Sequence, residues 1–211
     1  MKISILGAGR VGGNLASALA NKGHDVVVGH LDPAAAAARW QGPAVRHVSL
    51  AEAAGESPLV IHATPGDTAL QTLSALSKPL EGKILLDVSN ATERLPNGMP
   101  GGLCYPNGSL AEELQIALPQ TRVVKSLNTM LFSVMTAPRG LETPPTAFVS
   151  GNDPEAKSVV QALLGELGWP TEWILDLGRI ESARAAEALI LIVPHLIGAK
   201  GFRPFAVSAV F

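Results

Sequence analysis

Short apolar runs alternate along the chain with segments whose apolar residues recur every three or four positions. The first run covers residues 2–6 and the next covers 26–28; between them, Val11, Leu15 and Leu19 stand at helical spacing. Runs of this length predict buried strands, and the intervening spacing predicts an amphipathic helix. Because the alternation continues, the sequence predicts an α/β fold, a doubly wound parallel sheet with helices on both faces.

Further elements follow the same pattern. Strands are predicted at residues 59–63, 83–88, 121–127, 145–150 and 172–175. Helices are predicted to begin after side chains that suit N-caps, at Asp32, Ser49, Asp67, Ser109 and Asp153, and a closing helix is predicted at 179–199. The Pro- and Gly-rich residues 94–108 predict a long loop. We expect one domain over residues 1–211, with 140–211 as a smaller C-terminal subregion.

The turn after the first strand matches the GxGxxG dinucleotide fingerprint, with the sequence Gly7-Ala8-Gly9-Arg10-Val11-Gly12. In that fingerprint the first glycine makes the tight turn, the second lets the backbone approach a pyrophosphate, and the third lets the helix lie close to the strand. Free N–H groups at the helix N-terminus favour negative charge. We expect residues 7–12 to bind the pyrophosphate; the alternative is a glycine-rich turn that only packs a helix on the sheet.

Ligands of open parallel sheets bind beyond the carboxyl ends of the strands. Ala63, Thr64 and Pro65 follow one predicted strand, Asn90 follows the next, and Asn128 follows a third. We expect the first three to pack near the ribose and nicotinamide, and the two asparagines to flank the nicotinamide. The loops at 128–132 and 94–108 are expected to shape a second pocket. The alternative is that the proline and glycine residues here only make turns.

The end of the second strand decides between NAD and NADP. An acidic residue there would bind the ribose 2′-hydroxyl of NAD, whereas basic residues would accept the 2′-phosphate of NADP. Gly29 stands where the acid is expected, and His30 and Leu31 follow at the adenosine ribose. His30 and Arg10 can donate to a phosphate, and Asp32 is better explained as a helix cap. The sequence favours NADP, with NAD as the alternative.

The composition excludes several classes of protein. Sixteen basic and 18 acidic residues give a net charge of −2, so no basic surface is present for nucleic acid or an anionic membrane. The single cysteine rules out an internal disulfide and a thiolate metal cluster, which predicts a cytoplasmic protein without a metal site. Apolar residues reach 47% and charged residues 16%, which indicates an apolar surface covered by a second copy, a homodimer. The apolar segment 188–197, interrupted by Pro194, is too short to span a bilayer.

The sequence presents no clear general acid or base. His62 lies within an apolar strand, where a hydrogen-bonded core histidine is expected; Cys104 and Tyr105 lie in the predicted loop without a partner. Metalloprotease, serine-hydrolase and Walker motifs are absent. We predict no catalytic side chain, because hydride transfer between two stacked cofactors depends mainly on their positions.

The chain resembles the F420-dependent NADP oxidoreductase family over nearly its whole length. The resemblance rests on Ile5-Leu6-Gly7-Ala8-Gly9-Arg10-Val11-Gly12, Val27-Val28-Gly29, Ala63-Thr64-Pro65, Asp87-Val88-Ser89-Asn90 and Val123-Val124-Lys125-Ser126-Leu127-Asn128-Thr129. It implies a Rossmann domain with a small C-terminal helical part, NADP as the coenzyme, and F420 or a flavin lying over the nicotinamide. The chain departs from the family at His30 and Leu31, where Ser-Arg is usual.

Two other functions stay open. A dinucleotide-binding sensor or partner protein would use the same turn without turnover, because a fold does not fix a function. A reductase of a small organic substrate would need a proton donor near the nicotinamide.

Overall fold

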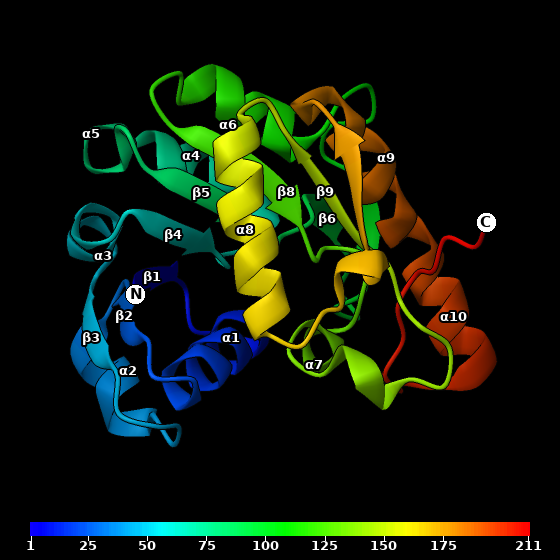
Figure 1. The fold of residues 1–211 in the computed structure, drawn as a ribbon, viewed down its shortest axis with the longest axis horizontal. Coiled ribbons are helices and arrows are strands. Elements are labelled where there is room, and N and C mark those ends of the chain that lie inside the picture. The colour runs from blue at the N-terminus through cyan, green and yellow to red at the C-terminus, as the bar shows by residue number, and fades with distance from the viewer.

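A computed structural model describes all 211 residues and contains an eight-stranded sheet in the order β10-β9-β8-β5-β4-β1-β2-β3. Its strands are β1 (Lys2–Leu6), β2 (Asp25–His30), β3 (Arg46–Ser49), β4 (Leu59–His62), β5 (Ile84–Asp87), β8 (Arg122–Ser126), β9 (Ala147–Gly151) and β10 (Ile174–Gly178). The six strands from β8 to β3 pair in parallel. The predicted doubly wound α/β fold is confirmed, with helices on both faces of the sheet (Figure 1).

Ten α-helices connect the strands. They are α1 (Arg10–Asn21), α2 (Pro33–Arg39), α3 (Leu50–Glu56), α4 (Ala69–Ser74), α5 (Ser77–Leu80), α6 (Leu110–Ala117), α7 (Phe132–Met135), α8 (Pro154–Glu166), α9 (Ala183–Ala188) and α10 (Val193–Lys200). Four predicted caps are confirmed, because the side chains of Asp32, Ser49, Ser109 and Asp153 each accept a hydrogen bond from the backbone N–H three residues later. Each such cap contributes about 1 kcal/mol.

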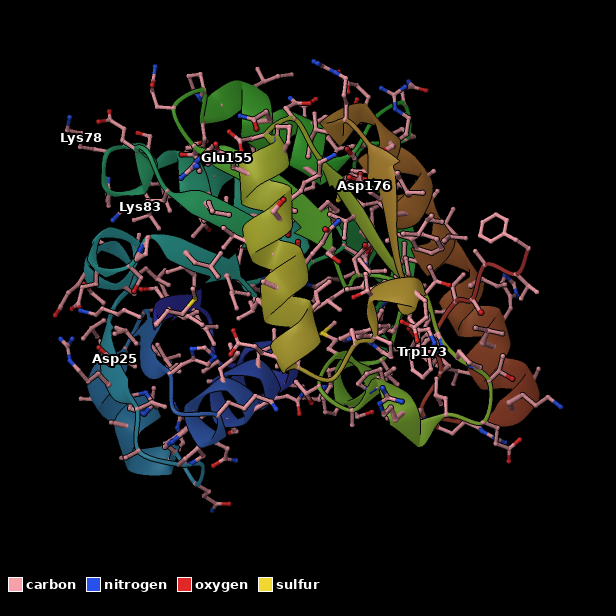
Figure 2. The ribbon with its side chains drawn as sticks, in the orientation of Figure 1. Asp25, Lys78, Lys83, Glu155, Trp173 and Asp176 are labelled. Carbon is pink, nitrogen blue, oxygen red and sulfur yellow. The ribbon has the colours of Figure 1, made fainter.

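The sheet separates two hydrophobic cores. Ile3 and Ile5 of β1 pack with α1 and α8 on one face, whereas Leu6 and the neighbouring Val27 of β2 pack with α3, α4 and α6 on the other. Both faces are covered because successive strand residues point to opposite sides. Charged side chains such as those of Lys78 and Lys83 lie at the periphery (Figure 2).

Two strands depart from the predicted parallel sheet. β9 runs antiparallel to β8, with Val124 opposite Gly151, and β10 is parallel to β9. The segment between β8 and β9 holds only the four-residue α7 and a 3₁₀ turn at Pro138–Gly140. A parallel strand needs a crossover long enough to return along the sheet. Without one, β9 starts at the edge where β8 ends and runs the opposite way.

Local predictions fail where turn residues or tertiary pairing override the pattern. The predicted 94–108 loop contains a hairpin instead, because β6 (Thr92–Arg94) pairs antiparallel with β7 (Pro100–Leu103). The edge strand β3 was not predicted; its four residues include only one buried side chain, Val48. Asp67 caps no helix; its carboxylate lies 2.7 Å from Arg94 Nε, and α4 begins after Thr68.

The closing helix has the predicted length but is less regular than predicted. Between residues 180 and 200, α9 and α10 alternate with 3₁₀ turns at Ile180–Ser182 and Leu189–Ile192. The run Ile180–Lys200 has a mean hydropathy of 1.3 in its most apolar window, of which 17% is buried. By length and composition it reaches the minimum for a membrane span, in contrast to the ten-residue segment considered from the sequence. In the structure α9 packs on α6 and β9 instead.

Candidate functional site

The turn between β1 and α1 is crowded at two glycines and open at the third. Gly7 has a φ of +93°, and a Cβ added there would lie 2.8 Å from the carbonyl oxygen of Ala63. A Cβ on Gly12 would lie 1.9 Å from the Gly7 oxygen, whereas a Cβ on Gly9 would meet nothing within 4 Å. Gly7 and Gly12 therefore make the turn possible, and Gly9 leaves free space at the N-terminus of α1, where a phosphate is favoured.

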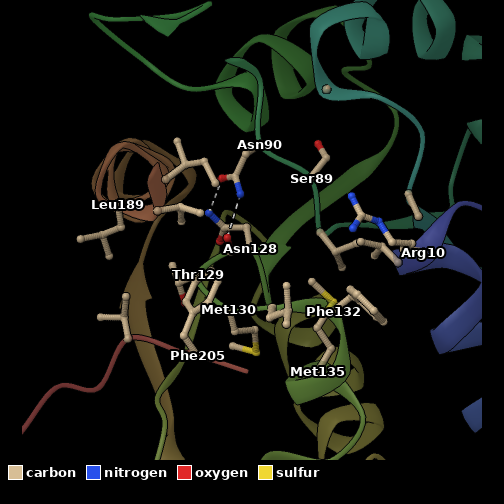
Figure 3. A pocket seen from close by; sticks show the side chains of 18 of the residues that line it. Arg10, Ser89, Asn90, Asn128, Thr129, Met130, Phe132, Met135, Leu189 and Phe205 are labelled. Atoms are coloured by element: carbon tan, nitrogen blue, oxygen red, sulfur yellow. Dashed lines mark hydrogen bonds between the residues drawn. The ribbon is translucent and has the colours of Figure 1, made fainter. Parts of the chain in front are cut away.

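A pocket of about 330 Å³ opens beside this turn (Figure 3). Its polar wall comes from the loops after the parallel strands, with Thr64, Ser89, Asn90, Asn128 and Thr129. Its apolar wall comes from Met130 to Phe132, Met135, the helical run near its 3₁₀ turn, and the last residues of the chain. The volume lies at the lower end of the range for small-molecule sites.

Most residues predicted from the strand ends meet in this pocket. The pocket is lined by Arg10, Val11, Ala63, Thr64, Asn90 and Asn128. Pro65 does not line it, whereas the next residue, Gly66, does. Gly7, Ala8, Gly9 and Gly12 lie in the adjoining turn, and His30 and Leu31 lie outside the pocket, at the end of β2. The binding roles of all these residues stay predictions.

Asn90 and Asn128 are joined by two hydrogen bonds in the pocket wall. Asn90 Nδ2 donates to the Asn128 backbone oxygen at 2.8 Å, and Asn128 Nδ2 donates to Asn90 Oδ1 at 2.9 Å. The preceding Leu127 is the one non-glycine residue with a positive φ, +62°. Such a conformation costs of the order of 1–3 kcal/mol and occurs preferentially at functional sites. It turns the chain so that Leu127 fills the core while Asn128 lines the pocket.

Two polar atoms of the pocket residues have no partner within the protein. Asn128 Oδ1 and Thr129 Oγ1 are buried and make no hydrogen bond. A buried polar atom without a partner costs about 1–3 kcal/mol, which a ligand's hydrogen bond would recover. A carboxamide suits this pair, because its NH₂ group donates to an amide oxygen and its carbonyl accepts from a hydroxyl. The wall therefore fits the amide end of a nicotinamide.

Packing explains Gly29, and two histidines lie near the end of β2, one from that strand and one from β3. A Cβ on Gly29 would lie 2.8 Å from the Cβ of Ala53 in α3, so no side chain fits there. His30 ends the strand, with its Nε2 2.8 Å from Nδ1 of His47 in β3. Burial and then the neighbouring His47 lower the pKa of His30, and burial lowers the pKa of His47. A positive charge here is disfavoured, which makes this pair a weaker phosphate site than an arginine.

A group of titratable side chains lies buried behind the polar wall. Lys125 Nζ is 2.9 Å from Asp87 Oδ2 and 2.9 Å from Glu187 Oε1, and His62 Nδ1 is 2.9 Å from Asp87 Oδ1. Each of these four side chains is at most 5% exposed. The Glu187 carboxylate also accepts from the N–H groups of Leu110 and Ala111 at the N-terminus of α6, which ties α9 to α6.

Sequence reasoning missed this ionic cluster, defined as His62, Asp87, Lys125 and Glu187. The available signal is a pair of opposite charges in two otherwise apolar strands, and Asp87 and Lys125 are paired residues of β5 and β8. The prediction that His62 is a hydrogen-bonded core histidine is confirmed. Cys104 and Tyr105 do not line the pocket; burial, then Asp67 and Glu93, raise the pKa of the Cys104 thiol.

The ionic cluster predicts a loss of stability in acid. Burial would raise the pKa of Asp87, but the charge of Lys125 and the hydrogen bond from His62 hold that pKa well below its ordinary range. A pKa lowered by folding stabilises the protein above the unfolded value, about 3.9, and this contribution is lost as the pH falls below it. Urea unfolding between pH 7 and pH 3 should show the free energy of unfolding decreasing below about pH 4.

A surface carboxylate provides the control for that titration. Hydrogen bonds from Arg46 and Lys2 lower the pKa of Glu56 to about 2. Glu56→Gln removes its contribution to the acid-linked loss and leaves that of the ionic cluster. An unfolding free energy in Glu56→Gln that no longer changes between pH 5 and pH 3 would contradict the role given to Asp87.

The C-terminal residues form a part of the pocket wall that the sequence did not indicate. Phe202, Phe205 and Val207 line the pocket. Leu131 N donates to the Phe205 oxygen at 2.9 Å, and Val207 N donates to the Thr129 oxygen at 3.1 Å. The predicted 128–132 loop does shape the pocket, whereas the β6–β7 hairpin lines a neighbouring hollow that shares Asn90 with it.

Comparisons with known proteins agree with this geometry. The family described as NADP oxidoreductase, coenzyme F420-dependent, matches residues 2–91. A solved structure from Arthrobacter sp. FB24, provisionally assigned as an F420-dependent NADP reductase, is 39% identical, with a TM-score of 0.92 and 100% of both chains covered.

Two curated proteins are similar over a part of their own lengths. The F420-dependent NADP reductase of Methanocaldococcus jannaschii is 32% identical over 70% of this chain and 64% of its own length. The Metalloreductase STEAP3 of Rattus norvegicus is 33% identical over 90% of this chain, which spans 36% of the rat protein. The glycine turn, the strand order and these matches together show that the chain belongs to the F420-dependent NADP oxidoreductase family.

Proposed function

We propose that this chain is an NAD(P)H-dependent oxidoreductase in which hydride passes directly between the nicotinamide and a second redox cofactor, F420 or a flavin. The observation that carries the proposal is that the open space at Gly9 directly precedes, along the chain, two residues that line the pocket, Arg10 and Val11. The pyrophosphate would lie on residues 7–12, and the adenosine ribose near His30 and Leu31. The nicotinamide would lie against Ala63 and Thr64, with Pro65 behind them, between Asn90 and Asn128.

The opposite wall of the pocket supports a flat second ring. Met130, Phe132 and Phe205 present apolar surface there, and 15 of the 22 lining residues are hydrophobic. Apolar and aromatic walls with a few placed polar groups are typical of cofactor sites. The archaeal relative, described as an F420-dependent NADP reductase, supports F420 as the partner.

The experiment mixes the purified protein with NADPH and, in turn, F420, FMN and FAD without oxygen. We expect the absorbance of the reduced nicotinamide to fall with one of these acceptors. Tight binding of NADPH without oxidation by any acceptor would favour the dinucleotide-binding sensor instead. Oxidation only with a carbonyl or imine would favour the reductase of a small organic substrate.

Calorimetry with both coenzymes tests the NADP preference. Gly29 brings no acidic charge to the end of β2, and the His30–His47 pair can donate to a 2′-phosphate when protonated. We expect NADPH to bind more tightly than NADH, and the difference to shrink as the pH rises, because a lowered histidine pKa leaves fewer protonated rings. If NADPH and NADH bind with equal affinity at both pH 6 and pH 8, the preference for NADP is contradicted.

Removing residues 202–211 tests the role of the C-terminal wall. We expect this deletion to weaken binding of the second cofactor at least about tenfold, or about 1.4 kcal/mol, because it opens the apolar side of the pocket. Affinity for NADPH should change much less, since residues 7–12 are untouched. The control deletes only Val210 and Phe211, which are 84% and 102% exposed and lie outside the pocket. Fluorescence titration with the second cofactor measures its affinity for both deletion variants. Equal losses of affinity in the two variants would contradict a role of the C-terminal residues in the pocket wall.

We further propose a cytoplasmic homodimer. Leu191, Ile192 and Phe202 are 44%, 46% and 62% exposed, and all come from the C-terminal helical run and the residues after it. Covering such side chains is a common reason for self-association. Sedimentation of the wild type and of Ile192→Asp should give a dimer and a monomer; a monomeric wild type would contradict the proposal.

A further inference from the structure

One hydroxyl of the pocket wall is backed by a buried chain of hydrogen bonds. Thr64 lines the pocket, and its Oγ1 lies 2.7 Å from Nε2 of His62. Nδ1 of the same ring lies 2.9 Å from Asp87 Oδ1, and both His62 and Asp87 are 0% exposed. A hydroxyl, an imidazole and a carboxylate in this order form a path along which a proton can move.

We propose that Thr64 donates the proton that accompanies hydride transfer, and that His62 resupplies it from within the protein. This inference deepens the proposed function and rests on it. Thr64 is the group that would touch the acceptor, whereas His62 and Asp87 act through it as positioning residues. The inference revises the sequence-based expectation that the chain holds no catalytic side chain.

The hydrogen-bond partners fix the direction of the relay. The Asp87 carboxylate accepts from Ser89 N, Ser89 Oγ and Lys125 Nζ, so it remains an acceptor toward His62, and Nδ1 of that ring carries a proton. In neutral His62, Nε2 is then the acceptor and the Thr64 hydrogen points to it. Protonation of Nε2 reverses this bond, which frees the Thr64 hydrogen to point into the pocket. Thr64 therefore donates to a bound acceptor only when His62 is cationic.

The charged groups near His62 come from three elements of the fold. Asp87 from β5 contacts the ring, Lys125 from β8 contacts Asp87, and Glu187 from α9 contacts Lys125. Two carboxylates face one ammonium, so a proton on His62 makes the buried cluster neutral. Arg10 of α1 lines the same pocket as Thr64.

The relay defines the class of acceptor by its chemistry. The acceptor carbon takes a hydride, with its two electrons, from the reduced nicotinamide, and the conjugated heteroatom takes a proton from Thr64 Oγ1. Thr64 regains a proton from His62 Nε2, and the neutral ring regains one from water through Thr64 after the product has left. A C=O or C=N acceptor, or the conjugated ring of a deazaflavin, uses both the hydride and the proton. A one-electron acceptor such as ferric ion does not take up a hydride and a proton.

Two substitutions at one position test the relay. Thr64→Val keeps the shape and removes the hydroxyl, whereas Thr64→Ser keeps the hydroxyl. At saturating NADPH and F420, Thr64→Val should lower the single-turnover rate of hydride transfer by about a hundredfold or more, the range of general acid catalysis, and Thr64→Ser should restore most of it. The wild-type rate should fall as the pH rises, because the relay needs a proton on His62, and Thr64→Val should lose this dependence.

A measurement on the coenzyme-free protein is independent of turnover. NMR of the ring nitrogens in histidine-labelled protein should find neutral His62 protonated on Nδ1, and His62→Gln identifies its signals among those of the five histidines. Protonation of the neutral ring on Nε2 overturns the relay, as do equal rates in Thr64→Val and Thr64→Ser. If none of the acceptors supports NADPH oxidation by the wild type, the proposed function and the relay are both overturned. If the wild type oxidises NADPH and Thr64→Val does so at the same rate, the relay alone is overturned.

Discussion

Gly9→Val is expected to lower the affinity for NADPH by at least about a hundredfold, or about 2.8 kcal/mol, while the protein stays folded. Gly9 has an extended backbone, with φ −67° and ψ −164°, which a β-branched residue adopts without strain. A Cβ there meets no protein atom within 4 Å, so the added side chain would project into the space that the pyrophosphate needs. Calorimetry measures the affinity, and thermal unfolding shows that the fold persists.

A glycine four positions further along the chain provides the matched control. A Cβ on Gly13 would lie 3.7 Å from the nearest atoms, which is ordinary contact, and Gly13 is within α1. Gly13→Ala should keep the NADPH affinity and stabilise the helix by up to about 1 kcal/mol. An affinity in Gly9→Val that is within threefold of the wild type would mean that the coenzyme does not use this turn.

Lys125→Met is expected to lower the free energy of unfolding by about 3–5 kcal/mol, a large share of the stability of a small domain. The substitution preserves the length of the side chain and removes the one cation between Asp87 and Glu187. Burial alone would lower the pKa of Lys125, but the two carboxylates raise it, which shows that their attraction outweighs the desolvation of the ammonium. Without the ammonium of Lys125, the negative charges of two buried carboxylates are no longer balanced by a cation between them.

Urea unfolding measures this loss against a surface lysine. The side chain of Lys78 is 86% exposed and pairs with Glu81 at 3.0 Å (Figure 2). Lys78→Met should change the free energy of unfolding by less than about 1 kcal/mol, because exposed ion pairs contribute little. A loss below about 1 kcal/mol in Lys125→Met would indicate that water reaches the cluster and solvates both carboxylates.

The sequence predicts the parts of this molecule that depend on neighbours along the chain. The glycine turn, the helix caps at Asp32, Ser49, Ser109 and Asp153, and every parallel strand except β3 are signalled within a few residues. The strand ends also predict part of the pocket, because the carboxyl ends of parallel strands meet at one edge. Arg10, Thr64 and Asn128 are brought together in this way.

Features that depend on distant segments could not be predicted. Glu187 meets Lys125 only after α9 has packed on α6 and β9, and no local pattern connects these residues. The pairing of Phe205 with Leu131 likewise joins segments more than 70 residues apart. His62 combines a predictable and an unpredictable feature. Its burial follows from its place in an apolar strand, whereas its hydrogen bond to Thr64 depends on the turn after that strand.

The reversal of β9 and β10 has a consequence for how the site is assembled. Because these two strands run against the others, β10 ends at the edge of the sheet that is remote from the ligand-facing loops. The chain must then travel back across the whole sheet, and α9 and α10 deliver residues 189–207 to the pocket (Figure 1). Had β10 been parallel to β8, the same helices would lead away from the pocket. One inverted pair of strands thus allows later residues of the same chain to cover the pocket.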